Sequence, residues 1–457
     1  MLVAALAACG SEEAAPQADP PVHLTIAVSA GFPKNSELVF DSLVMAKGDD
    51  VLPLLATAVA AESNNRIFSL PLRKGVTWHD GKPLTADDVA ASLRRAGVQQ
   101  IQSVVPNGDS VTVNLKAPDP EFPRRVLART PIMRPGDTTT GTGPYKLTAP
   151  DTLTANPSYF GGKPQVATIK ATVIPQAAAQ LSALRAGKVH LIAHALPARH
   201  VEELRKQDQI GVAQGTEFGA TTLTFNTARP PFDRPEVRRA IARGVDVEEL
   251  VNTALYGQGT PGSPGFVHIE SPLQGMPQPL LFDPEQGRRE LDSLGAKAGP
   301  GGVRMLEGKA MRYRLIIDSG SSERLRAAEL IRDKLHEIGI AVEVKPVADV
   351  RKISAYDLAL REWPAPVQLS GAGLSWMLNT AGFESPALRT LTTSPVLQTR
   401  IDAAGTLQNQ IAQQVPFLTL YYPYGSYAFR KDVYDGWRWQ NGATLLNRLS
   451  FVEYELD

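Results

Sequence analysis

Residues 68–89 read FSLPLRKGVTWHDGKPLTADDV and decide the local fold of their part of the chain. The alternating apolar residues of 66–72 predict a short strand. Residues 77–83, with their glycine and proline, are typical of a turn. A helix is predicted to begin after Thr85, because its hydroxyl can cap the helix and Asp88 is placed to complete a capping box. The stretch therefore predicts a strand, a turn and a capped helix in succession.

Strand-like and helix-like patterns alternate along the chain on both sides of this stretch. Residues 313–317, 321–338 and 341–344 predict a strand, an amphipathic helix closed by Gly339, and a second strand, which together make a βαβ unit. Further strands are predicted at 22–29, 111–115, 165–174 and 221–225, and further helices at 177–186 and at 236–256 with an interruption near Gly244. The predicted class is α/β with mixed sheets.

The composition describes a folded protein of several domains. The 457 residues correspond to about three domains, and 43% hydrophobic residues are enough for a full core. Lys plus Arg and Asp plus Glu both total 47, so no excess charge favours nucleic acid. No apolar run of 18 residues predicts a membrane-spanning helix. With a single cysteine, Cys9, neither an intrachain disulfide nor a cysteine-rich zinc site is expected.

The cysteine lies in a distinctive context. Residues 1–8 are short and apolar, and residues 6–10, LAACG, resemble a bacterial lipobox. Residues 11–21 have the composition of a flexible tether. We expect lipidation of Cys9, with the folded body held at the outer face of a membrane. An incidental cysteine in an apolar start, or a translation start further upstream, are the alternatives.

Signatures of catalysis are weak or missing. Residues 257–262 match G-x-G-x-x-G in letters, but a helical pattern precedes them, which disfavours a dinucleotide loop. His336 and Glu337 would begin H-E-x-x-H, but position 340 is Ile340. There is no G-x-S-x-G elbow and no phosphate-binding P-loop motif. We expect no catalytic residues and no cofactor.

Three histidines cluster in the sequence, at His190, His194 and His200. Metal binding by them is possible on spacing, but no cysteine or locally arranged acid supports it, so surface or packing roles are favoured and no metal is expected. Large aromatics concentrate in the last hundred residues, where some could line a ligand cleft while most belong to the core. Arg361, Glu362 and Trp363 follow a strand-like segment and place a donor fork, a carboxylate and an aromatic face at one strand end.

Residues 68–89 closely resemble the signature of the extracytoplasmic solute-binding proteins of family 5, the peptide and nickel receptors of ABC importers. The resemblance continues, in the order of the family, at residues 141–145, 156–164, 183–187, 225–227, 231–233, 237–241, 255–257 and 282–284. Membership implies a two-lobed periplasmic-binding-protein fold of the hinge-closing type II, with mixed sheets and an extra subdomain in lobe I.

By that analogy lobe I comprises residues 22–40, 141–222 and 420–457, the extra subdomain 41–140, and lobe II 223–419, while residues 1–21 are a signal remnant and tether. The implied function is capture of an oligopeptide or similar small polar solute between closing lobes and its delivery to an ABC permease. A monomer outside the cytoplasm, anchored by lipid and without catalytic activity, is expected.

The resemblance suggests ligand contacts at Arg361, Glu362, Trp363, Trp376 and Phe218, with Arg129 as a carboxylate clamp; a surface or packing role is the alternative for each. Peptide-binding relatives often carry an acidic cluster after the tryptophan, but here 364–368 read PAPVQ, which leaves only Glu362. Nickel-type relatives tend to carry a histidine nearby, and none lies between 351 and 400. A nickel or metal-chelate receptor, a sensory or scaffolding protein, and a hydrolase remain as alternatives.

Overall fold

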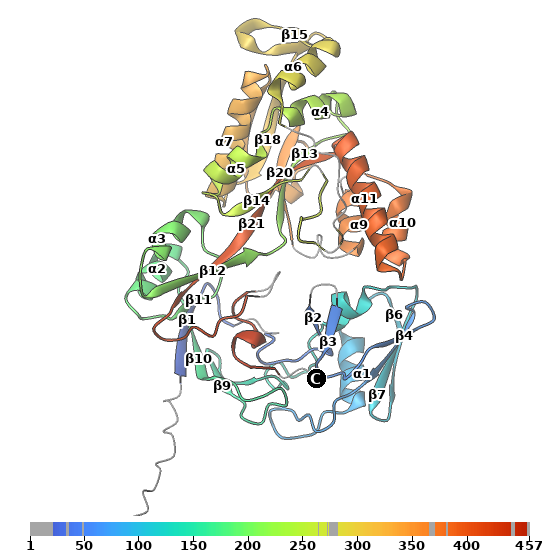
Figure 1. The fold of residues 1–457 in the computed structure, drawn as a ribbon, viewed down its shortest axis with the longest axis vertical. Helices are drawn as coiled ribbons and strands as arrows, with labels where there is room; N and C mark the ends of the chain where they lie inside the picture. The colour runs from blue at the N-terminus through green and yellow to red at the C-terminus, as the bar shows by residue number, and fades with distance from the viewer. Residues whose placement is uncertain are drawn as a thin grey trace, which may run out of the picture.

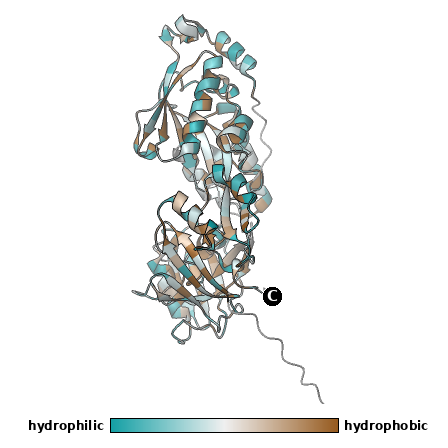
Figure 2. Cartoon of the chain, turned by 90° about the vertical axis from the view of Figure 1, so that its left-hand side faces the viewer, coloured by the Kyte–Doolittle hydropathy of each residue, from teal (hydrophilic) through white to brown (hydrophobic). Residues whose placement is uncertain are grey.

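The computed structural model describes residues 22–32, 36–47, 50–263, 265–271, 273, 282–364, 371–380, 383–439 and 444–454. Cys9 and the predicted tether lie outside the described residues. Figure 1 shows two lobes, one above the other, connected by strands on one side. We call the lower one lobe I and the upper one, which contains α4–α7 and α9–α11, lobe II. Figure 2 shows hydrophobic residues concentrated along the strands of the lower lobe.

One large sheet runs through both lobes, in the order β19-β18-β20-β13-β21-β11-β1-β10-β9-β8, with β12 and β14 also paired to β21. Its strands are β1 (Val22–Val28), β8 (Tyr145–Ala149), β9 (Thr152–Ala155), β10 (Val166–Val173), β11 (Leu191–Ile192), β12 (Ile210–Thr216), β13 (Ala220–Phe225), β14 (Gly259–Pro261), β18 (Arg312–Asp318), β19 (Ala341–Val347), β20 (Leu358–Trp363) and β21 (Phe417–Arg430). The first residues of β21, up to Tyr421, pair with β13, and its last residues, from Tyr424, pair with β12. The sheet is continuous because β21 belongs to both lobes.

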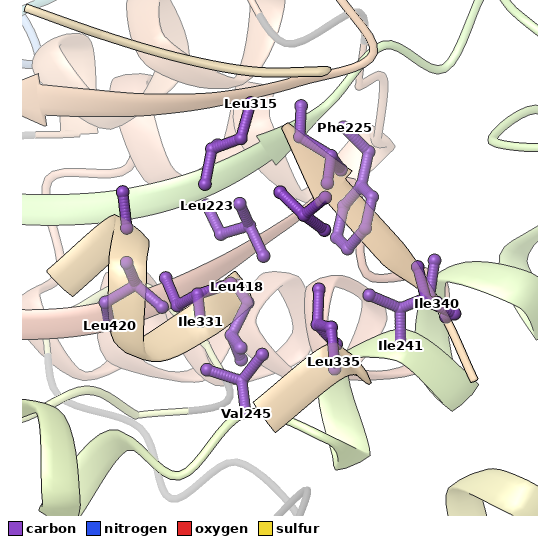
Figure 3. Packing of buried hydrophobic residues seen from close by; sticks show 14 of the residues in the cluster. Leu223, Phe225, Ile241, Val245, Leu315, Ile331, Leu335, Ile340, Leu418 and Leu420 are labelled. Atoms are coloured by element: carbon purple, nitrogen blue, oxygen red, sulfur yellow. The ribbon is translucent and has the colours of Figure 1, made fainter. Parts of the chain in front are cut away.

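Lobe II packs helices on both faces of its part of the sheet. These are α4 (Pro235–Arg243), α5 (Val247–Ala254), α6 (Pro284–Ser293), α7 (Ser322–Glu337), α9 (Gly371–Thr380), α10 (Pro386–Thr393) and α11 (Leu397–Gln414). Side chains of β13, β18 and β21 pack with α4, α5 and α7 in the core that Figure 3 shows. Trp363 and Phe417, from β20 and β21, pack instead with α9–α11. Because successive side chains of a strand point to opposite faces, the lobe II part of the sheet contributes to one hydrophobic core on each face.

The predicted βαβ unit is confirmed by β18, α7 and β19. The two strands pair in parallel from Arg312 with Ala341 onward. The Ser321 hydroxyl accepts a hydrogen bond from the Arg324 N–H at the start of α7, and Gly339 ends the helix with φ at +87°. A small sheet of β15 (Lys297–Ala298), β16 (Arg304–Leu306) and β17 (Lys309–Ala310), with the single turn η3 (Pro300–Gly302), and the turn η4 (Val350–Lys352) complete this lobe.

Residues 68–89 fold as predicted, within a part of lobe I that has its own hydrophobic core. Strands β4 (Ala60–Glu62), β5 (Ile67–Pro71), β6 (Ile101–Asn107) and β7 (Ser110–Leu115) form a sheet in the order β4-β5-β7-β6. Side chains of β5, β6 and β7 pack with α1 (Ala86–Arg95), beside the hairpin β2 (Val44–Lys47) and β3 (Asp50–Pro53) and the turn η1 (Pro123–Leu127). Thr85 and Asp88 form the predicted capping box at the start of α1. Trp78 is fully buried in this core.

His79 connects two of the segments that carry the family resemblance. Its Nδ1 accepts a hydrogen bond from the Gly141 N–H at 3.2 Å, and its Nε2 lies 3.0 Å from the Gly143 carbonyl oxygen. Because the amide can only donate, Nε2 must carry the proton and the ring is neutral. A Cβ at Gly141 would lie 1.7 Å from the Val39 carbonyl oxygen, so only glycine fits there.

The rest of lobe I comprises the sheet around β1, the helices α2 (Ala177–Arg185) and α3 (Val201–Arg205), and the turns η2 (Ala198–His200) and η5 (Arg448–Ser450). A buried ion pair holds the C-terminal segment to this lobe. Arg448 donates to Asp41 at 2.6 Å, and both side chains are almost inaccessible, at 3% and 0%. Thr142 and Tyr159 also donate to Asp41, each at 2.9 Å. Three segments far apart in sequence therefore meet on one carboxylate.

We predict that Asp41→Asn destabilises the protein by about 3–5 kcal/mol, because it removes the fully buried counter-charge of the Arg448 guanidinium and leaves Glu37, which is 40% exposed, as its ion-pair partner. The matched control is Asp432→Asn, which removes an exposed carboxylate 2.6 Å from Arg430 and should cost less than about 1 kcal/mol. Urea unfolding of the three proteins measures both effects. Equal losses in the two variants would contradict the structural role of the buried pair.

A second prediction concerns pH. Burial lowers the pKa of His79 below its usual value of 6.5. As the pH falls, His79 is therefore protonated in the unfolded chain before it is protonated in the folded chain. The contribution of His79 to the free energy of unfolding is complete above about pH 6.5 and declines as the pH falls. Denaturant titrations from pH 8 to pH 5 should show a shallower loss for His79→Gln than for the wild type. His23→Gln, at an exposed position of β1, is the control and should keep the wild-type slope.

Candidate functional site

Two connections cross between the lobes next to each other. Residues Glu217, Phe218 and Gly219 join β12 to β13, while β21 passes from one partner strand to the other between Tyr421 and Tyr424. Phe218 is buried and has φ at +56°, which is uncommon for a residue other than glycine. Its N–H donates to the Thr216 hydroxyl at 3.2 Å. The chain thus turns sharply from the sheet of lobe I into that of lobe II.

Several aromatic side chains gather beside this crossing, and we call them the aromatic group: Phe218, Phe266, His268, Trp363, Trp376 and Tyr422. Trp363 pairs in register with Ala220, at the start of β13. Its indole N–H donates to the Thr222 hydroxyl at 3.0 Å, and its ring meets Trp376 edge to face at 5.6 Å. Trp376, in α9, is 55% exposed and is the member of the group that solvent reaches most.

The remaining members connect Trp363 to Phe218. Phe266 contacts Trp363 edge to face, and His268 contacts both Phe218 at 5.3 Å and Tyr422 at 4.6 Å. Burial lowers the pKa of His268 to about 4, so its ring is neutral at physiological pH. Its Nδ1 accepts from the Glu270 N–H at 3.0 Å. His268 therefore serves as a packed, uncharged ring at the crossing.

The sequence trio Arg361, Glu362 and Trp363 is divided between two faces of the sheet, because successive side chains of a strand alternate. Arg361 lies on the Trp363 face with its guanidinium 5.3 Å from the Tyr356 ring centre. Its Nε is buried and has no hydrogen-bond partner among the described residues. Glu362 lies on the other face and forms an ion pair with Arg324 of α7. The Glu362 carboxylate and the Arg361 guanidinium therefore lie on opposite faces of the sheet and do not point to the same site.

Arg129 lies apart from the other predicted residues. It follows η1 in lobe I and is exposed, whereas the aromatic group belongs to lobe II and the crossing. A ligand that contacts both Arg129 and the aromatic group must therefore contact both lobes. The structure thus brings together Phe218, Trp363 and Trp376 and places Arg361 on the same strand face as Trp363, while Glu362 and Arg129 are separate from them.

Sequence reasoning missed Phe266, His268 and Thr222. The first two lie in a segment rich in proline and glycine, whose composition is typical of a surface connection, and no local pattern marks them as neighbours of Trp363. Thr222 could have been found, because it occupies a buried strand position where a hydroxyl requires a partner. Its partner lies on another strand, and pairing of that kind is not visible in a single sequence.

Two of the three clustered histidines form structural hydrogen bonds within lobe I. His190 accepts from the Thr25 N–H through Nδ1, and the Nε2 of His194 lies 2.6 Å from the Gln180 side-chain oxygen. Within the described part of the chain, no three histidine, cysteine or acidic side chains are grouped as metal ligands would be. Among the described helices, none combines the length and apolar character that crossing a membrane requires.

The five tryptophans differ in exposure, which gives a direct test of the site. Trp78, Trp363 and Trp437 are buried, Trp439 is half-buried, and Trp376 is exposed. We predict that iodide, which quenches only accessible indoles, loses most of its effect on emission in Trp376→Phe. Trp437→Phe is the matched control and should leave the quenching unchanged. Quenching that stays the same in Trp376→Phe would show that α9 covers this indole.

Comparison with known proteins places the chain in a family. The family model of the bacterial extracellular solute-binding proteins, family 5 Middle, matches residues 50–385. The chain is 26% identical over 335 residues to the oligopeptide-binding protein AppA of Bacillus subtilis, a match that covers 64% of this chain and 60% of AppA. It is 28% identical over 355 residues to protein XP55 of Streptomyces lividans, covering 70% and 64%. The chain therefore spans about 60% of the length of these curated relatives.

Solved structures show the same fold. NikA of Brucella suis in complex with Fe(III)-EDTA superposes with a TM-score of 0.82 at 21% identity, covering 96% of this chain and 100% of NikA. The two-lobed α/β fold with mixed sheets, expected from the resemblance, is confirmed by such neighbours. The chain belongs to the bacterial extracellular solute-binding proteins of family 5.

Proposed function

We propose that this protein is the substrate-binding component of an ABC importer, which captures an oligopeptide or a similar small polar solute between its lobes and delivers it to the permease. The observation that carries the proposal is the position of the aromatic group and Arg361 beside the two crossing connections, at the end of β20 that faces lobe I. The protein binds without making or breaking a bond. It acts outside the cytoplasm, as the family name implies.

Family relatives support the ligand class. AppA of Bacillus subtilis is named an oligopeptide-binding protein, and its solved structure holds a nonapeptide. In the present chain, Trp376 offers an exposed indole to an apolar side chain or a peptide plane. Arg361, which is half-buried, offers its guanidinium charge to a ligand carboxylate. Trp376 packs against the buried Trp363, and the Arg361 guanidinium packs over Tyr356.

Glu362 and Arg129 have smaller roles in the proposed binding of the ligand. Glu362, whose side chain is 60% exposed, is engaged by Arg324, so it would hold a ligand amine only by sharing that partner. Arg129 would approach a ligand carboxylate from lobe I and so contact it only when the lobes are close. A ligand that contacts both lobes favours the closed form by its differential affinity, and about 5.5 kcal/mol moves a 1:99 population to 99:1.

The division into domains and the anchor belong to the same proposal. We assign residues 22–40, 141–222 and 420–457 to lobe I, 41–140 to its extra subdomain and 223–419 to lobe II. Separate hydrophobic cores for the subdomain and for lobe II support this division. A lipid on Cys9 would hold a monomer near its permease in the membrane.

A metal-chelate receptor is the second candidate, and the likeness to NikA in complex with Fe(III)-EDTA favours considering it. A chelate presents its own carboxylates, so a protein needs cations and aromatic surfaces to hold it and need not supply metal ligands. Arg361, Arg129 and Trp376 suit such a chelate as well as they suit a peptide.

A sensory or scaffolding role is a further alternative. Adjacent permease and ATPase genes would argue against it.

The test is a titration with di- to pentapeptides and, in parallel, with nickel–histidine and Fe(III)-EDTA complexes, followed by tryptophan emission. We predict binding of one class, weakened about tenfold or more in Trp376→Ala because an aromatic anchor is lost. Trp437→Phe should bind as the wild type does. Native mass spectrometry should recover the ligand intact after long incubation. Binding by neither class, or turnover of a bound peptide, would overturn the proposal.

A further inference from the structure

A buried carboxylate connects the two lobes on the side away from the crossing. The two oxygens of Glu121, just before η1 in lobe I, lie 2.9 and 3.0 Å from the backbone nitrogen of Gly371, which donates to them. Gly371 is the first residue of α9 in lobe II. The Glu121 side chain is only 4% exposed. Residues 250 positions apart in the sequence thus form a hydrogen bond from one lobe to the other.

Groups of both lobes attract the charged form of Glu121, although its burial opposes that form. Arg124 of lobe I lies 3.7 Å away, and Arg400 of α11 in lobe II attracts the carboxylate electrostatically, while Asp119 repels it. The start of α9 adds the positive end of a helix dipole. Burial, the largest influence, raises the pKa of Glu121. A carboxylate this deeply buried is tolerated only with such partners, and separating the lobes would remove those from lobe II.

The contact between Glu121 and Gly371 lies far from the crossing between the lobes. Figure 1 shows β12 and β21 crossing on one side of the molecule, while α9–α11 lie above the hairpin β2–β3 on the other. A rotation about the crossing displaces the far side most. Gly371 is also tightly placed, because a Cβ there would lie 2.8 Å from the Leu391 backbone oxygen. The packing of α9 against α10 therefore fixes the position of the Gly371 N–H that donates to Glu121.

We propose that Glu121 is a latch: a positioning residue that stabilises the closed arrangement of the lobes by a contact of the protein with itself, in addition to the contacts of any ligand. Trp376 lies on α9, so the latch also fixes the helix that presents this indole to the site. The proposal rests on the proposed function only in requiring that the lobes can separate. It predicts that some closed protein exists before ligand binds.

The test measures the distance between the lobes in ligand-free protein. Spin labels at Asp109→Cys and Thr390→Cys, two exposed positions in the two lobes, are introduced into Cys9→Ser protein, and pulsed EPR gives the distance distribution. We expect the ratio of open to closed protein to rise about tenfold or more in Glu121→Ala, as for loss of a charge-assisted hydrogen bond. Glu121→Gln, which keeps an acceptor oxygen, should give a smaller rise.

The matched control is Glu62→Gln, an exposed glutamate of β4 in the same part of lobe I, which should keep the wild-type distribution. Thermal unfolding verifies that each variant is folded; if Glu121→Ala is not, Glu121→Gln carries the test. A folded Glu121 variant with the distribution of Glu62→Gln overturns the latch. If Glu121→Ala opens the lobes but a pool of di- to pentapeptides never binds, the latch stands and peptide capture fails.

Discussion

The structure depends on one strand that satisfies its backbone hydrogen bonds in two lobes. β21 pairs with β13 at its start and with β12 at its end, and the β12–β13 connection follows it across the same gap. A strand cannot leave its ladder without exposing unpaired polar groups, so both lobes are held to it. The cores remain separate, because the apolar clusters on the two faces of the lobe II sheet share no residue with the clusters of lobe I. Relative motion of the lobes must therefore come from the few residues at the crossing.

Local packing around the crossing agrees with this constraint. Gly215 and Gly425 face each other across β12 and β21, and neither position has room for a side chain. A Cβ at Gly215 would lie 2.2 Å from the Trp439 indole, and one at Gly425 would lie 2.3 Å from a Glu217 carboxylate oxygen. Two larger side chains therefore cover the strand pair where it approaches lobe II. The Tyr427 hydroxyl donates to Glu217 at 2.7 Å and keeps that carboxylate in place.

Local features of the sequence were predictable because neighbouring residues determine them. The capping box of Thr85 and Asp88, the βαβ unit and the glycine that ends α7 each follow from a few adjacent positions. The family resemblance then supplied the two-lobed architecture, which comparison with solved structures confirms. That two matching segments contact each other through His79 was not visible, because hydrogen bonds between distant segments leave no mark in one sequence.

The site was harder to predict for the same reason. Arg361, Glu362 and Trp363 are consecutive, and the alternation of strand side chains already implies that they cannot share one face. Trp376 and Phe218 come to the site from a helix and from a crossing connection, and only the tertiary fold places them near Trp363. The contact of Glu121 with Gly371 depends on how two lobes meet, which no local pattern encodes. Whether these side chains contact a ligand stays a prediction.

In the proposed function a ligand is held between two lobes, and the interior of each lobe does not change. Hydrogen–deuterium exchange with and without a bound ligand tests it most directly. Slower exchange is predicted at Glu217 to Gly219, at the end of β20 and at the start of α9, with no change in β1, β10, β18 and β19. Protection spread through the core strands of one lobe, with none at the crossing, would contradict the claim.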